Sequence, residues 1–142
     1  MAMALDLTNN SVLIVDDVRD MRTSLRAIVK SMGAATVYEA KNGAEAIECV
    51  QSNEVDLVLC DYDLGEGRDG QQVFEEAKEF GIIAPTTAFL MITADNTTDV
   101  VMAVVDHSPD GYLIKPLNKS VLELRLEKII HRKRVLKDID TC

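Results

Sequence analysis

The sequence of 142 residues lacks any apolar run long enough to cross a membrane. Its longest apolar stretches, such as Val100–Val105, contain about six residues. Residues 1–10 have neither a basic region nor a long apolar region, so we expect no signal peptide. The three cysteines, Cys49, Cys60 and Cys142, form no CxxC pair. Their odd number disfavours a disulfide scaffold, and we expect reduced thiols in a cytoplasmic protein.

Basic side chains are fewer than acidic ones, and the formal net charge at pH 7 is -9. The acidic excess lies in residues 1–114, whereas residues 115–142 carry more basic than acidic side chains. Because an acidic body repels phosphate backbones, we expect no nucleic-acid binding by this domain. We interpret the basic run His131–Arg134 as a solvated helix face, which is common for so short a run.

The chain also has no internal repeat, no low-complexity segment and no linker rich in Pro or Ser. A hydrophobic fraction of 47% and a charged fraction of 27% suit one soluble domain of ordinary size. We therefore predict an N-terminal extension over 1–10 and a single domain over 11–130. Residues 131–142 are predicted to form a helical tail or the start of a linker to a further domain.

Short apolar runs alternate with segments of helical periodicity along the chain. The predicted strands are Ser11–Val15, Thr36–Ala40, Leu57–Cys60, Ala88–Thr93 and Gly111–Ile114. The predicted helices are Arg19–Met32, a helix opened by Asn42 or Gly43 and ending near Ser52, Gln71–Phe80, Thr97–His107, and a last helix capped by Asn118 or Ser120 that runs to about Asp138. This alternation predicts an α/β fold with a parallel sheet covered on both faces.

Polar residues follow or end four of the predicted strands. Asp16 and Asp17 follow the first strand, Asp61 follows the third, Thr93 ends the fourth, and Lys115 follows the fifth. Each signal is weak alone, since an Asp after an apolar run is often a helix cap. Their coincidence indicates one site, because open α/β sheets hold ligands in the crevice at the carboxyl ends of their strands.

The acidic residues of this crevice suit a hard divalent cation. Mg2+ prefers oxygen ligands and keeps several of its waters. Asp17 and Asp61 are candidate carboxylate ligands, with Asp16 placing a water. The backbone carbonyl of Asp63 is a further candidate ligand, since it follows Asp61 by two residues.

The same crevice suits a phosphoryl group. Asp61 is a candidate nucleophile, because a carboxylate can attack phosphorus to give an aspartyl phosphate. Lys115 would neutralise one phosphoryl oxygen, and Thr93 would donate a hydrogen bond to another. Phosphoryl transfer depends mainly on such positioning and charge neutralisation.

Together these motifs resemble the response-regulator receiver domain of two-component signalling. The matching residues are Asp16-Asp17, Asp61, Thr93-Ala94, Tyr112 and Lys115-Pro116, and the resemblance extends from about Ser11 to Ile130. It implies a flavodoxin-like, doubly wound sheet of five parallel strands in the order 2-1-3-4-5. The expected role is that of a signalling phosphoacceptor, which catalyses only its own phosphorylation and dephosphorylation.

The resemblance also implies roles for single residues. A histidine kinase or histidine phosphotransfer protein would transfer its phosphoryl group to Asp61. Mg2+ would bind at Asp16, Asp17 and Asp61. Thr93 and Tyr112 would form the conformational switch. Lys115-Pro116 resembles the cis peptide of the family, and X-Pro bonds are the ones that adopt this isomer readily.

The segment Asp61–Gly70 departs from the family pattern. It lacks the Met-Pro-like turn, is about one residue longer and carries two additional glycines. Asp63 and Asp95 also flank the expected phosphoryl position, where additional carboxylates can repel or orient water. We therefore regard the geometry of this loop, and its effect on the lifetime of the phosphate, as open.

Two other functions are alternatives for the same residues. Asp61-Tyr62-Asp63 resembles the D-x-D motif of haloacid-dehalogenase-type phosphatases, which also form an aspartyl phosphate with Mg2+. Those enzymes usually carry this motif in their first strand, whereas here an Asp pair lies upstream. Alternatively, the chain is a binding module that keeps the fold but is not phosphorylated.

The last predicted helix bears on the output of the domain. Leu122, Ile129 and Leu136 keep the seven-residue spacing of coiled coils, although three positions are weak support. The helix would either connect to an output domain after residue 142 or pair with a second copy of the chain. The alternative is that Leu122 and Ile129 pack on the sheet and only the end of the helix is exposed.

Overall fold

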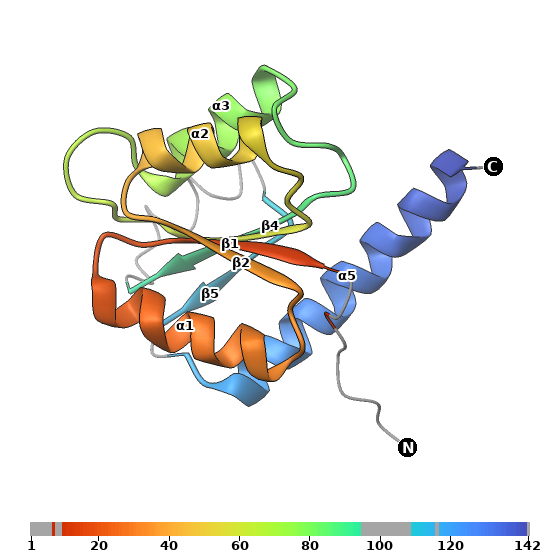
Figure 1. Ribbon diagram of the computed structural model, residues 1–142, viewed down its shortest axis with the longest axis horizontal. Coiled ribbons are helices and arrows are strands. Elements are labelled where there is room, and N and C mark those ends of the chain that lie inside the picture. Colours follow the sequence, from red (N-terminus) through yellow and green to blue (C-terminus); the bar gives the residue numbers. More distant parts are fainter. Residues whose placement is uncertain (1–6, 8–9, 95–108, 116, 142) are drawn as a thin grey trace.

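The computed structural model describes residue 7 and residues 10–94, 109–115 and 117–141, with side chains described as far as residue 133. Five strands form one parallel sheet in the order β2-β1-β3-β4-β5 (Figure 1). The strands are β1 Ser11–Val15, β2 Thr36–Ala40, β3 Leu57–Asp61, β4 Ala88–Thr93 and β5 Gly111–Ile114. The predicted flavodoxin-like fold and its strand order are therefore confirmed.

Helices cover both faces of this sheet, as Figure 1 shows. The described helices are α1 Arg19–Ser31, α2 Gly43–Ser52, α3 Gly70–Glu79 and α5 Lys119–Thr141. Helices α1 and α5 pack on one face through Leu25, Val29, Leu122 and Leu126. Helices α2 and α3 pack on the other face through residues such as Ile47 and Phe74. The central strands are buried on both sides, which explains why they read as continuous apolar runs.

Most element boundaries agree with the predictions, and the differences have local causes. β3 continues through Asp61, because Asp61 pairs in register with Ile92 of β4. α3 begins at Gly70, where Asp69 and Gln72 form a capping box. The cap of α5 is Asn118, whose side chain accepts from the Val121 N–H at 2.9 Å, and Ser120 lies within the helix.

The described ends of α1, α2 and α5 lie close to the predicted positions. Asn42 is the N-cap of α2, and its side chain accepts from the Glu45 N–H at 2.8 Å. Of the two predicted starts, Asn42 is therefore the cap, and the helix begins at Gly43. α1 ends at Ser31, and Met32 is its C-cap. α5 continues to Thr141, slightly farther than predicted. The predicted helix Thr97–His107 lies outside the described residues.

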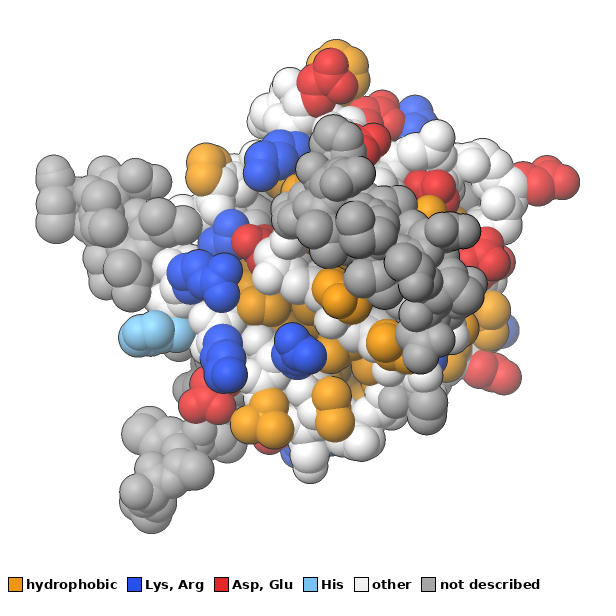
Figure 2. Space-filling view, turned by 180° about the vertical axis from the view of Figure 1, so that it is seen from behind, with side chains coloured by type: hydrophobic (Ala, Val, Ile, Leu, Met, Phe, Trp, Pro, Cys, Tyr) orange, Lys and Arg blue, Asp and Glu red, His pale blue; other side chains and the backbone are white. Residues whose placement is uncertain are grey.

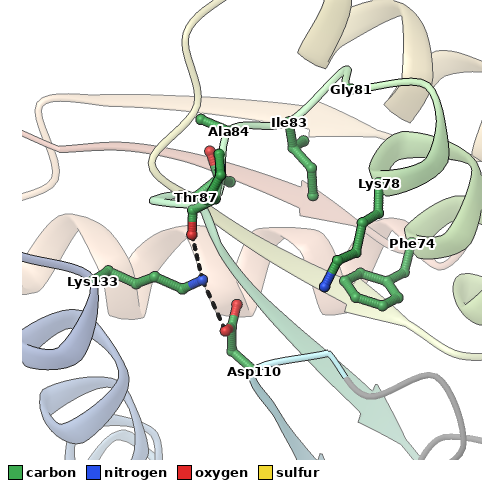
Figure 3. A pocket seen from close by; sticks show the side chains of 9 residues that line it. Phe74, Lys78, Gly81, Ile83, Ala84, Thr87, Asp110 and Lys133 are labelled. Carbon is green, nitrogen blue, oxygen red and sulfur yellow. Dashed lines mark hydrogen bonds and ion pairs between the residues drawn. The ribbon is translucent and has the colours of Figure 1, made fainter. Parts of the chain in front are cut away.

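The far part of α5 projects past the body of the domain in Figure 1. Lys133 anchors the helix before that point. Its Nζ lies 3.0 Å from Asp110 Oδ1 and donates to the Pro85 carbonyl at 2.6 Å. Figure 3 shows Lys133 and Asp110 pointing toward each other beside a hollow of about 460 Å³. The helix is thus tied to the residue that immediately precedes β5.

Leu122 and Ile129 are buried in the core on the sheet, as expected if this part of the last helix packs on the sheet. Apolar side chains are nevertheless exposed on β5 and α5, namely those of Ile114, Val121 and Leu124. Figure 2, which views the domain from behind, shows apolar side chains interspersed with Lys and Arg side chains. Self-association through the last helix stays a prediction.

Candidate functional site

Three carboxylates meet at the carboxyl edge of the sheet. β1 and β3 are neighbours, with Val15 opposite Cys60, so the residues that follow these positions lie close together. Asp16, Asp17 and Asp61 each offer an oxygen, and these oxygens all lie within 4.8 Å of one another. Asp16 and Asp61 are buried, whereas Asp17 is exposed. The oxygen donors and their spacing fit a small divalent cation that retains waters on its open side.

Lys115 supplies the positive charge of the site. Its Nζ lies 2.8 Å from Asp61 Oδ2 and 3.4 Å from Asp16 Oδ2. The backbone N–H of Lys115 donates to the carbonyl of Thr93 at 2.7 Å. This bond holds the Lys115 backbone beside the end of β4. Thr93 is itself buried at that end. The structure thus brings all four predicted strand ends to one edge.

The charges in this cluster shift the pKa of two groups. Burial raises the pKa of Asp61 to about 6, and the charge of Asp16 adds to the rise. The hydrogen bond from Lys115 opposes this change without cancelling it. Burial would lower the pKa of Lys115, but its contacts with Asp61 and Asp16 raise the pKa overall. Lys115 therefore remains a cation, and the carboxylate cluster carries an electrostatic cost when no cation is bound.

The β3–α3 loop folds back on the site. The Asp63 N–H donates to Asp61 Oδ1 at 3.2 Å, and Asp63 Oδ1 accepts from the Gly65 N–H at 3.1 Å. Leu64 is buried in the core on the α2 and α3 face, which pins the middle of the loop. Gly65 has a φ of 77°, and a Cβ there would lie 3.3 Å from Asp17 Oδ2. The additional glycine therefore lets the loop pass close to the acidic cluster.

Gly70 closes the same loop. Its N–H donates to the Tyr62 carbonyl at 2.8 Å. A Cβ at this position would collide with the carbonyl oxygen of Asp61 and lie 2.7 Å from Met91 Sδ. The lack of a side chain at Gly70 thus allows the start of α3 to pack directly on the backbone that carries Asp61. The sequence alone identifies Gly70 only as the end of this loop.

Tyr112 is half-buried and packs against the core on the α2 and α3 face, where it is paired in register with Met91. Cys60 is fully buried, and burial raises the pKa of its thiol well above the usual value. Asp95 and Pro116 lie outside the described residues. The role of the Asp63 carbonyl as a metal ligand stays a prediction.

One contact at the site was missed by sequence analysis. Arg22 Nη1 donates to the backbone carbonyl of Asp16 at 2.7 Å. Helical side chains lean toward the N-terminus of their helix, and Arg22 lies in the first turns of α1. A basic residue at this distance after an acidic pair is therefore at most a weak signal for such a contact.

Comparison with known protein families gives one match that covers most of the chain. The model of the response regulator receiver domain matches residues 12–127. The transcriptional regulatory protein ZraR of Klebsiella oxytoca is 33% identical over 124 residues, which cover 87% of this chain and 27% of ZraR. Chemotaxis protein CheY-3 of Vibrio cholerae serotype O1 is 27% identical over 130 residues, with 87% of this chain and 94% of CheY-3 covered.

Solved structures agree with these matches. The crystal structure of a two-component response regulator from Clostridium difficile superposes with a TM-score of 0.76 at 27% identity. The superposition covers 87% of this chain and 97% of that chain. The present chain thus spans nearly the whole of CheY-3 and about a quarter of ZraR. In the described part of the chain, no helix has both the length and the apolar character to cross a membrane.

Proposed function

This chain belongs to the response regulator receiver domain family, and we propose that it accepts a phosphoryl group on Asp61 in two-component signalling. The observation that carries the proposal is the position of the Asp61 carboxylate. It lies 2.8 Å from the Lys115 ammonium and shares the acidic cluster with Asp16 and Asp17. A nucleophilic carboxylate, a cation and a set of oxygen ligands are the parts that phosphoryl transfer needs.

In the proposed reaction an Asp61 carboxylate oxygen attacks the phosphorus of a phosphohistidine. A P–O bond forms, the P–N bond breaks, and the leaving imidazole takes up a proton. Mg2+, when held by Asp16, Asp17, Asp61 and the Asp63 carbonyl, supplies positive charge that offsets the repulsion between the two anions. The donor is a histidine kinase or a histidine phosphotransfer protein.

The remaining residues stabilise and report the phosphorylated state. Lys115 leaves its pairing with the free carboxylate and neutralises a phosphoryl oxygen. Thr93, at the end of β4, donates its hydroxyl to another oxygen. Tyr112 lies on the neighbouring strand, half-buried, and turns inward when Thr93 moves. One added charge at the site thereby biases a domain that has two conformations.

The switch is proposed to control an output domain or a partner. ZraR is a transcriptional regulatory protein of which the present chain spans about a quarter. Helix α5 projects beyond the sheet, so it suits either a connection to an output domain or pairing with a second copy of the chain. Domain limits of 11–130, with a tail over 131–142, remain our proposal.

Intact-mass spectrometry after incubation with acetyl phosphate and Mg2+ tests the proposal. We expect one phosphoryl adduct on the wild type, and none on Asp61→Asn or without Mg2+. Absence of an adduct on a folded wild type that binds Mg2+ would favour the binding module that is not phosphorylated. Turnover of a generic phosphate ester by the wild type would instead favour the phosphatase alternative.

A further inference from the structure

Arg22 connects the acidic pair to strand β2. Besides donating to the Asp16 carbonyl at 2.7 Å, its Nε lies 3.3 Å from Glu39 Oε1. The Arg22 side chain is only 16% exposed, so these contacts are largely shielded from solvent. Glu39 also pairs with Arg26, whose Nη1 lies 3.2 Å from Oε2. The guanidinium of Arg22 is therefore held at two points in a fixed orientation.

The carbonyl that Arg22 binds belongs to the peptide group that joins Asp16 to Asp17. Because this group is planar, fixing its oxygen fixes the direction in which the chain enters Asp17. Asp16 has other restraints: its N–H donates to the Ala40 carbonyl at 3.1 Å, and its Oδ1 accepts from the Val18 N–H at 2.8 Å. Among the described residues, no hydrogen bond holds the exposed Asp17 carboxylate. The placement of Asp17 therefore depends on its backbone.

We propose that Arg22 is a positioning residue for the metal site, acting through the bridge between the Asp16 carbonyl and Glu39. The inference rests on the proposed function, because it assigns Asp17 to the ion. Residues that orient metal ligands affect affinity by about tenfold or more when they are removed. Arg22 touches none of the three carboxylates in the described contacts, so its effect passes through the backbone.

Charge and position predict opposite effects at this residue. Arg22 is a cation near a cation site, so its charge alone disfavours Mg2+. Replacing it with a neutral residue would then tighten Mg2+ binding. Loss of the bridge would instead free the Asp16-Asp17 peptide and weaken binding. The sign of the change in Mg2+ affinity therefore separates the two roles.

Isothermal titration calorimetry of the whole chain with MgCl2, which measures the Mg2+ affinity, tests the proposal. We expect Arg22→Gln to weaken Mg2+ binding by about tenfold. Arg26→Gln is the matched control. It also removes one positive charge that pairs with Glu39, but Arg26 makes no contact with Asp16. Its Mg2+ affinity should equal or slightly exceed that of the wild type. Arg22→Lys keeps the charge but cannot span both partners with one ammonium, so it should also weaken binding.

Urea unfolding of each variant without metal accompanies the titrations. Reduced stability of Arg22→Gln with an unchanged Mg2+ affinity would assign Arg22 to the fold alone and overturn the proposal. Tighter binding in Arg22→Gln, wild-type affinity in Arg22→Lys, or equal weakening in Arg26→Gln would overturn it as well. No Mg2+ binding by the wild type would instead remove the metal site of the proposed function, and this inference with it.

Discussion

Removing the charge of Asp61 should stabilise the metal-free domain. Burial, with the charge of Asp16, raises the pKa of this carboxyl to about 6, whereas its ordinary value is 3.8. The folded state therefore binds the Asp61 proton more tightly than the unfolded state does. Ionisation of Asp61 therefore lowers the free energy of unfolding. This loss of stability is absent below the ordinary pKa of 3.8, grows as the pH rises, and is complete above about pH 6.

The magnitude follows from the difference between the two pKa values. About two pH units correspond to about 3 kcal/mol, since each unit is worth about 1.4 kcal/mol. The site opens to solvent on the side of Asp17, and screening there reduces the effect to about 1–2 kcal/mol. We expect Asp61→Asn to exceed the wild type in stability by this amount near neutral pH.

Urea unfolding in the presence of a chelator measures this difference. The gain of Asp61→Asn should be full at about pH 8 and roughly half as large at about pH 5, between the two pKa values. Mg2+ should reduce the gain, because it binds the folded wild type more tightly than the variant. Glu48→Gln, which removes an exposed charge on α2, is the control and should change stability by less than about 0.5 kcal/mol.

Three results would contradict this account of the site. The first is an Asp61→Asn variant that is no more stable than the wild type at about pH 8. The second is a gain of the same size at both pH values. The third is an equal gain in Glu48→Gln, which would attribute the effect to the net charge of -9 rather than to the cluster.

Three further predictions concern the framework around the site. Gly70→Ala should destabilise the domain by about 2–3 kcal/mol in urea unfolding, because its Cβ would collide with the backbone of β3. Gly67→Ala, with open space but a φ of 89°, should cost about 1 kcal/mol, and equal losses would contradict the role of the close contact. Lys133→Met should destabilise the domain by about 1 kcal/mol through loss of the α5 anchor, whereas exposed Lys128→Met should be neutral. Cys60 should resist alkylation until urea unfolds the domain, because burial raises the pKa of its thiol. Peptide mapping measures the labelling, and rapid labelling of Cys60 in the folded protein would refute this.

The strands were predictable because parallel strands buried on both faces are continuous apolar runs. Ser11–Val15 and Ala88–Thr93 agree to the residue for this reason. The acidic cluster was predictable because the order of strands brings β1 and β3 together at one edge. The resemblance supplied that order, and the apolar pattern alone did not.

Other features depend on contacts that sequence periodicity does not encode. The bond from Arg22 to the Asp16 carbonyl requires the angle at which α1 leaves β1. The anchor between Lys133 and Asp110 joins residues of two distant elements. The start of α3 at Gly70 follows from a capping box in a loop whose length departs from the family pattern. Each is a tertiary or capping arrangement with only a weak local signal.

Locating the phosphoryl group within the chain tests the central claim most directly. The chain is phosphorylated with acetyl phosphate and Mg2+, the acyl phosphate is reduced with borohydride, and the peptides are sequenced by mass spectrometry. The account predicts that Asp61 alone is converted to homoserine and that omitting Mg2+ abolishes the conversion. Conversion at Asp63 or Asp17 with Asp61 intact would contradict the assignment of the phosphoacceptor.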